Sequence, residues 1–170
     1  MIFKNEIPIL EYDDDRTAVI NPARKKTVEI FPEKCVMTFF KEIVEKYAES
    51  EGTKKIASFK WENGNIDVYK LIYRGQEIAF VHLHVGAPVA VGIFEDIIGY
   101  GGKQFIACGG CGVLDDIDQS EILIPVSAVR DEGTSYHYKK ASREIEISQK
   151  GISAITKTLT EHKINYKKCK

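Results

Sequence analysis

Apolar positions in the first quarter of the chain recur at the spacing of short strands and one helix. After a polar start, residues 17–20 (TAVI) form an apolar run that predicts a strand. This strand is expected to end at Asn21, because a residue that precedes proline disfavours helix and commonly starts a loop. Residues 35–40 (CVMTFF) are apolar and β-prone, and residues 41–49 show helical spacing of their apolar side chains. The pattern predicts two strands and then a helix.

Three strand-like runs follow, at residues 55–61, 67–73 and 77–85. Asn63-Gly64 separates the first two and Arg74-Gly75 the second two. Both dipeptides are typical of tight hairpin turns, because glycine and asparagine accept the positive φ angles that such turns need. The three runs therefore predict an antiparallel meander.

Beyond the meander, the spacing of apolar residues changes from that of a strand to that of a helix. A glycine-proline loop at residues 86–88 precedes a helical pattern over residues 89–98, and glycines then end it before an apolar strand at residues 105–107. Strand, loop, helix, glycines and strand predict a β-α-β unit with parallel strands. The strand runs directly into residues 108–112 (CGGCG), a glycine cluster that lets a ligand approach the backbone.

The last third of the chain again alternates between strand-like and helical patterns. Residues 122–129 predict a second apolar strand, residues 149–161 a helix, and residues 164–170 the start of another strand. No internal repeat or linker divides the chain. We expect one α/β domain over residues 1–170, because this length supports a single core and is short for two.

Composition and charge are those of an ordinary globular protein, and they disfavour some classes of binding partner. The 170 residues are 44% hydrophobic and 29% charged, with a net charge of -1. This balance does not favour nucleic acid or an anionic membrane as partner. No apolar run approaches the roughly 20 residues of a membrane helix, and the start lacks the apolar core of a signal peptide. We expect a cytoplasmic protein with reduced thiols.

Metal and redox chemistry are weakly indicated. Cys108 and Cys111 form a C-x-x-C, but a redox dithiol usually begins a helix and a zinc site needs a second ligand pair nearby. We favour small residues that line a glycine turn. His82 and His84 share one strand face, and a hydrogen-bonded or pocket-lining pair is favoured over a metal site. Residues 115–118 lack the terminal glutamate of a calcium loop and predict a turn. No metal site is therefore expected.

Residues 130–138 (RDEGTSYHY) are dense in groups that bind polar ligands. They offer a cation, carboxylates, hydroxyls, an imidazole and aromatic rings. Such a set beside a glycine-lined turn suits a polar ring or a sugar, which stacks on aromatic faces and donates to carboxylates. The alternative is a polar surface loop.

Three segments together resemble the nucleoside phosphorylase superfamily, and its uridine phosphorylase-like branch in particular. They are VGAPVAVGIFEDII, GGKQFIACGGCGVL and IPVSAVRDEGTSYHY, in this order. The resemblance implies a three-layer α/β/α sandwich around a mixed central sheet. It implies cleavage of the N-glycosidic bond of a pyrimidine nucleoside such as uridine, with phosphate as co-substrate, no other cofactor, and a homo-oligomer that is a dimer or larger. It also implies that the last part of the fold lies beyond residue 170.

The resemblance also assigns site residues. Those implied to bind phosphate are Arg24, Gly86, Gly109 and Gly110. Those implied to bind the nucleoside are Cys111, Gly112, Arg130, Glu132 and His137, with His84 as a further pocket candidate. It assigns no catalytic residue.

Two alternative functions stay open at this point. Ile20, Ala107 and Gly110 stand where phosphorylases have a glycine, an arginine and a hydroxyl residue. Loss of the arginine removes a charge-assisted contact to phosphate. A nucleosidase that uses water, or a nucleoside-binding scaffold without activity, would tolerate these changes.

Overall fold

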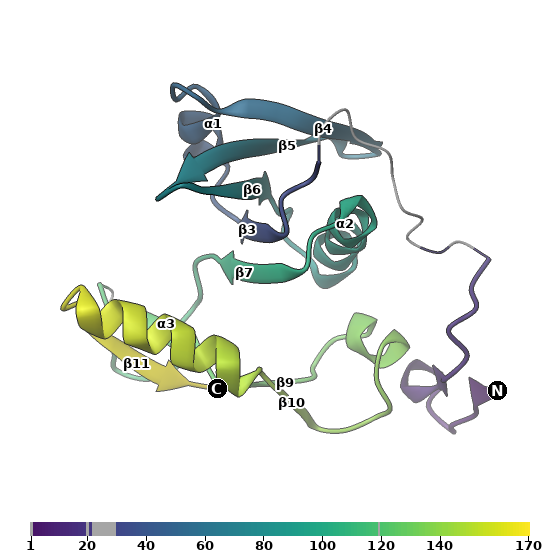
Figure 1. Ribbon diagram of the computed structural model, residues 1–170. Coiled ribbons are helices and arrows are strands. Elements are labelled where there is room, and N and C mark those ends of the chain that lie inside the picture. Colours follow the sequence, from purple (N-terminus) through teal and green to yellow (C-terminus); the bar gives the residue numbers. More distant parts are fainter. Residues whose placement is uncertain (1, 20, 22–29, 119) are drawn as a thin grey trace. The chain divides into compact units, whose positions relative to one another are not determined.

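The computed structural model describes residues 2–19, 21, 30–118 and 120–170, and these divide into two compact units (Figure 1). We call Thr17–Cys111 the sheet unit, and Met1–Arg16 with Gly112–Lys170 the terminal unit. One domain over residues 1–170 stays a prediction. Within the part of the chain that is described, no helix has the length and apolar character needed to cross a membrane.

The sheet unit is built on a five-stranded mixed sheet in the order β4-β5-β6-β3-β7. The strands are β3 (Lys34–Thr38), β4 (Lys54–Trp61), β5 (Gly64–Tyr73), β6 (Gln76–His82) and β7 (Gln104–Cys108). β4, β5 and β6 pair antiparallel in sequence order, which confirms the predicted meander. β3 pairs parallel with β6 on one side and with β7 on the other.

Helices cover both faces of this sheet. Helix α2 (Ala87–Tyr100) buries Ile93 and Ile97 in a cluster that includes Val81 of β6. The neighbouring residue Phe80 points to the opposite face, because side chains alternate along a strand. There its ring meets Tyr47 of α1 (Lys41–Ala48) edge to face, with 6.2 Å between the ring centroids. The predicted mixed sheet between helical layers is thus confirmed.

The predicted β-α-β unit is confirmed, with one strand inserted. α2 connects β6 to β7, and both strands run parallel to β3, which lies between them. Gly86 starts the helix with φ +114° and Gly101 ends it with φ +125°, values that residues with a Cβ rarely adopt. The glycines at both ends therefore set the length of α2.

The terminal unit contains short elements. They are β1 (Ile2–Phe3), a 3-10 turn (Pro8–Leu10), β2 (Tyr12–Asp13), β8 (Ile122–Pro125), β9 (Ser127–Val129), a second 3-10 turn (Thr134–His137), β10 (Glu144–Glu146), α3 (Gln149–Glu161) and β11 (Tyr166–Cys169). β1 with β2 and β9 with β10 pair antiparallel. β8 pairs parallel with β11, so the predicted final helix and the strand after it are confirmed.

Two predicted strands differ in the structure. The run predicted as one strand over residues 122–129 is two strands that meet at Val126. Its N–H donates to the carbonyl of Cys169 (2.9 Å) and its carbonyl accepts from Ile147 (3.1 Å), so the chain changes partner there. Residues 17–19 of the first predicted strand are irregular with Val19 exposed, and Ile20 lies outside the described residues.

Candidate functional site

The carboxyl ends of β3, β6 and β7 meet at one edge of the sheet, which we call the strand-end edge. The register aligns Thr38 with His82 on one side and with Cys108 on the other. Gly86, the N-cap of helix α2, lies four residues after the end of β6, so the N-terminus of the helix belongs to the same edge. In open α/β sheets, ligands bind outside the carboxyl ends of the strands. The glycine loops after β6 and β7 therefore lie at the edge where α/β sheets commonly bind ligands.

The loop after β7 is anchored at its start and open further along. The N–H of Phe39 donates to the carbonyl of Cys108 (3.0 Å), which extends the β3–β7 pairing by one residue. A Cβ at Gly109 would lie 2.7 Å from the Phe39 ring, whereas a Cβ at Gly110 would have no neighbour within 4 Å. Gly109 thus serves close packing, and Gly110 leaves its backbone accessible.

Gly86, Gly109 and Gly110, implied to bind phosphate, all lie at the strand-end edge. The first N–H groups of an α-helix have no acceptor within the helix, which makes a helix start such as that of α2 suited to anions. Arg24, the fourth residue of that set, lies outside the described residues. The phosphate-binding role of these residues stays a prediction.

His82 and His84 form a ring pair at the same edge. Their centroids are 4.9 Å apart, with 44° between the ring planes. Partial burial, and then the proximity of His84, lowers the pKa of His82 and so favours its neutral imidazole. Among the described residues, no three His, Cys, Asp or Glu side chains are grouped as ligands of one metal ion.

In the terminal unit, Arg130 is buried, with 6% of its surface exposed. Its Nε donates to the Ser135 hydroxyl (2.9 Å), and Nη1 donates to the carbonyl of Lys140 (2.6 Å) and to the Ser142 hydroxyl (2.9 Å). Nη2 donates to the carbonyl of Lys139 (2.9 Å). The guanidinium therefore holds residues 135–142 around itself.

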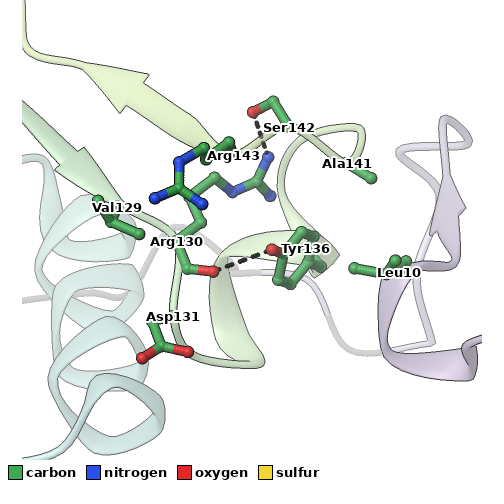
Figure 2. A pocket seen from close by; sticks show the side chains of 8 residues that line it. All are labelled: Leu10, Val129, Arg130, Asp131, Tyr136, Ala141, Ser142 and Arg143. Carbon is green, nitrogen blue, oxygen red and sulfur yellow. Dashed lines mark hydrogen bonds between the residues drawn. The ribbon is translucent and has the colours of Figure 1, made fainter.

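The ring of Tyr136 completes this arrangement, as Figure 2 shows. The guanidinium carbon lies 4.2 Å from the ring centroid, a cation-π contact, and the Tyr136 hydroxyl donates to the carbonyl of Arg130 (2.9 Å). All three guanidinium nitrogens donate to protein acceptors. The nucleoside-binding role implied for Arg130 thus stays a prediction, while its structural role is evident.

A hollow of about 670 Å³ opens beside this arginine (Figure 2). Its lining residues are Leu10, Val129, Arg130, Asp131, Tyr136, Ala141, Ser142 and Arg143. Of the residues implied to bind the nucleoside, Arg130 belongs to this lining, and Glu132 and His137 do not. Sequence reasoning missed Leu10 and Arg143, because nothing in the local sequence links these residues to residues 130–138.

Glu132 accepts hydrogen bonds from the backbone N–H groups two and three residues ahead, at Thr134 (2.7 Å) and Ser135 (3.1 Å). Hydrogen bonds from Ser135, its side chain first, and from Thr134 hold the pKa of Glu132 below its usual range. His137 is exposed at the end of the 3-10 turn. Gly112 belongs to the terminal unit and Cys111 to the sheet unit. The implied nucleoside set thus falls in both units.

Comparison with known proteins identifies the fold. No protein-family profile and no curated protein sequence matches the chain. Among solved structures, uridine phosphorylase from Vibrio fischeri ES114 matches with a TM-score of 0.69 and 23% identity over 80% of this chain and 56% of that chain. The same enzyme in complex with 6-hydroxy-1-naphthoic acid matches with a TM-score of 0.69 and 22% identity, over 80% and 55% of the two chains.

A purine enzyme matches as well. Purine nucleoside phosphorylase from Toxoplasma gondii in complex with immucillin-H has a TM-score of 0.72 and 16% identity, over 91% of this chain and 62% of that chain. The chain therefore spans 55 to 62% of the length of these solved structures. Over most of its length, this chain has the fold of the nucleoside phosphorylases.

Proposed function

We propose that this protein is a nucleoside phosphorylase that cleaves the N-glycosidic bond of a pyrimidine nucleoside such as uridine, with phosphate as co-substrate. The observation that carries the proposal is the shared fold with uridine and purine nucleoside phosphorylases over 80 to 91% of the chain. The segments 85–98, 101–114 and 124–138, in this order, also resemble the nucleoside phosphorylase superfamily.

Phosphate is proposed to bind at the strand-end edge. Backbone N–H groups at Gly86, Gly109 and Gly110 would donate to its oxygens, as helix starts and glycine loops do in other anion sites. Arg24 would supply the cation, because Ala107 presents a methyl group where phosphorylases have an arginine. Phosphate is the only co-substrate that the proposal needs.

The nucleoside is proposed to contact Cys111, Gly112, Arg130, Glu132 and His137, with His84 as a further candidate. In the reaction that the resemblance implies, the ribosyl group develops positive charge while the base departs. Positioning of the two substrates and electrostatic stabilisation would supply most of the rate enhancement. The proposal assigns no catalytic acid or base.

The test is release of free base from uridine and inosine by the purified chain, each with and without phosphate. Release that requires phosphate and yields ribose 1-phosphate supports the proposal. Release without phosphate, with free ribose as product, supports the nucleosidase that Ala107 would permit. No release by folded protein that is nevertheless stabilised by uridine in a thermal-shift assay supports the non-catalytic binding protein.

The phosphate site has its own test. Arg24→Gln is expected to raise the KM for phosphate at least tenfold, because a charge-assisted contact to phosphate is lost. Lys26→Gln, two residues away in the same basic run, is the matched control and should leave KM within about twofold. An equal effect of both substitutions would contradict a specific role of Arg24.

We further propose a cytoplasmic homo-oligomer, a dimer or larger, as the resemblance implies. Light scattering coupled to size-exclusion chromatography measures the mass in solution. A monomer at all concentrations would contradict this part of the proposal.

A further inference from the structure

The four cysteines of the chain differ sharply in accessibility. Cys108 and Cys111 are exposed, Cys169 is half-buried and Cys35 is buried. Burial raises the pKa of the Cys35 thiol to about 12, which keeps it protonated and unreactive. Cys108 and Cys111 are therefore the two most accessible thiols of the chain.

The sequence between these two thiols permits them to meet. A disulfide needs Cα atoms about 4.4–6.8 Å apart, and the first and fourth residues of a β-turn lie within about 7 Å. Both central residues, Gly109 and Gly110, are glycines, which accept the central dihedral angles of every turn type. Residues 109–111 are irregular and form no turn in the structure. A turn over residues 108–111, which the two glycines permit, would bring the two sulfurs within bonding reach.

The local packing fixes one end of this segment and leaves the other open. Cys108 is held by the hydrogen bond from Phe39 and Gly109 by contact with the Phe39 ring, whereas Gly110 has open space where a Cβ would be. Residues 109–111 form no helix or strand. Closing such a turn would therefore require movement of Gly110 and Cys111, whereas Cys108 stays paired with Phe39 at the end of β7.

The same surroundings argue against a thioredoxin-type catalyst. Such dithiols place the first cysteine at a helix N-terminus, which stabilises its thiolate. Here the irregular segment 109–118 contains no helix. The geometry favours a reversible modification over a redox enzyme.

We propose that Cys108 and Cys111 form a reversible intramolecular disulfide, which makes the loop after β7 a thiol-disulfide modification site. The oxidant is a low-molecular-weight disulfide such as glutathione disulfide. One protein thiolate attacks a glutathione sulfur, and one glutathione leaves as a mixed disulfide forms on the protein. The second protein thiolate attacks the protein-bound sulfur and releases the second glutathione. The two cysteines together lose two electrons, and the glutathione disulfide gains them.

This inference does not depend on the proposed function, but the two share a loop. Gly109 and Gly110 lie between the thiols, so the oxidised turn would reorient the N–H groups proposed to bind phosphate. If the proposed reaction exists, the oxidised protein is expected to lose at least tenfold in kcat/KM for phosphate and to recover it with dithiothreitol. The chemical test below needs no activity.

The experiment incubates the full chain with glutathione disulfide, alkylates the remaining thiols with N-ethylmaleimide and measures intact and peptide masses. The expected product is a monomer about 2 Da lighter before alkylation, with two thiols protected. The link should lie inside the peptide that spans residues 104–130, and reduction should reverse it. Cys169→Ser should oxidise in the same way as the parent protein.

Single variants separate the disulfide from other thiol chemistry. Cys108→Ser and Cys111→Ser should each stop at a glutathione adduct on the remaining thiol. Three results with the parent protein would each overturn the proposal. They are glutathione adducts on both thiols, a disulfide between two chains, and two thiols that still react with N-ethylmaleimide. Protection that zinc produces and a chelator removes, without the loss of mass, would also overturn it in favour of a metal site.

Discussion

At the scale of single residues, one buried side chain organises the polar segment after β9. Arg130 donates to two backbone carbonyls and two hydroxyls and stacks on Tyr136, so its charge is compensated inside the protein. A buried guanidinium is stable only with such a full set of partners. The segment 130–142 therefore takes its shape from this arginine.

Arg130→Lys is expected to lower the free energy of unfolding of the terminal unit by about 1–3 kcal/mol. A lysine keeps the charge but cannot reach acceptors on several sides, which leaves buried oxygens without donors. Urea titration followed by circular dichroism measures the change. Arg143→Lys is the matched control, because that side chain is 81% exposed, and it should stay within about 0.5 kcal/mol. Equal effects of the two substitutions would contradict the structural role.

Glu132 adds a pH dependence to the same segment. Its pKa lies below the unfolded value, so the carboxylate stabilises the fold above about pH 4.3 and loses this effect as the pH falls through the folded pKa. The parent protein should exceed Glu132→Gln in stability at pH 7, and the difference should shrink toward pH 3. Unfolding curves at several pH values measure it, and Glu146→Gln reports the general effect of removing one negative charge. A difference that grows in acid would contradict this assignment.

At the scale of elements, α2 packs closely against the last residue of β4. A Cβ at Gly92 would lie 2.2 Å from Cη2 of Trp61, so the indole ring occupies the space that a side chain would need. The indole N–H donates to the carboxylate of Asp96 (3.1 Å), one turn further along the helix. Glycine at residue 92 thus fixes the distance between helix and sheet.

Gly92→Ala is expected to destabilise the sheet unit by about 1–3 kcal/mol, because overpacking outweighs the helix propensity of alanine. Gly151→Ala in α3 is the matched control. It has no atom within 4 Å of the new Cβ, so it should stabilise by about 0.5–1 kcal/mol. The fluorescence of Trp61, the only tryptophan of the chain, follows the unfolding of the sheet unit in Gly92→Ala. Circular dichroism follows the unfolding of the terminal unit in Gly151→Ala. Stabilisation by Gly92→Ala would show that the indole moves aside at little cost.

At the scale of the whole molecule, burial is unevenly distributed. The sheet unit holds a continuous cluster of buried side chains between the sheet and α2. In the terminal unit the buried apolar side chains among the described residues are Ile124, Tyr136 and Ile152. Because buried apolar area is the main stabilising contribution, the two units should differ in local stability.

Amide hydrogen exchange is expected to be at least tenfold slower in β3, β5 and β6 than in β8 to β11. The central strands pair on both sides and lie against the apolar cluster, whereas the strands of the terminal unit form two-stranded sheets. Mass spectrometry of peptic peptides measures the rates. Equal protection in the two units would show that the terminal unit has partners beyond its own short sheets.

Much of the element order follows from local sequence. The apolar periods and the turn dipeptides predicted the meander, α1, α2, β7, α3 and the final strand, because each depends on neighbours within a few residues. Glycines that stop a helix or turn a hairpin act through their own dihedral angles, as Gly86 and Gly101 do. The mixed α/β class and its resemblance to the nucleoside phosphorylases were also evident from sequence.

Only the tertiary structure determined which strands pair and which groups the polar side chains contact. That β3 lies between β6 and β7, and that the strand over 122–129 breaks at Val126, depends on hydrogen bonds to residues far away in sequence. The ligand contact that sequence assigns to Arg130 stays a prediction, and only the structure shows that its guanidinium donates to acceptors in residues 135–142. Local sequence determines which conformations each segment favours, whereas burial and long-range hydrogen bonding determine which groups remain available to a ligand.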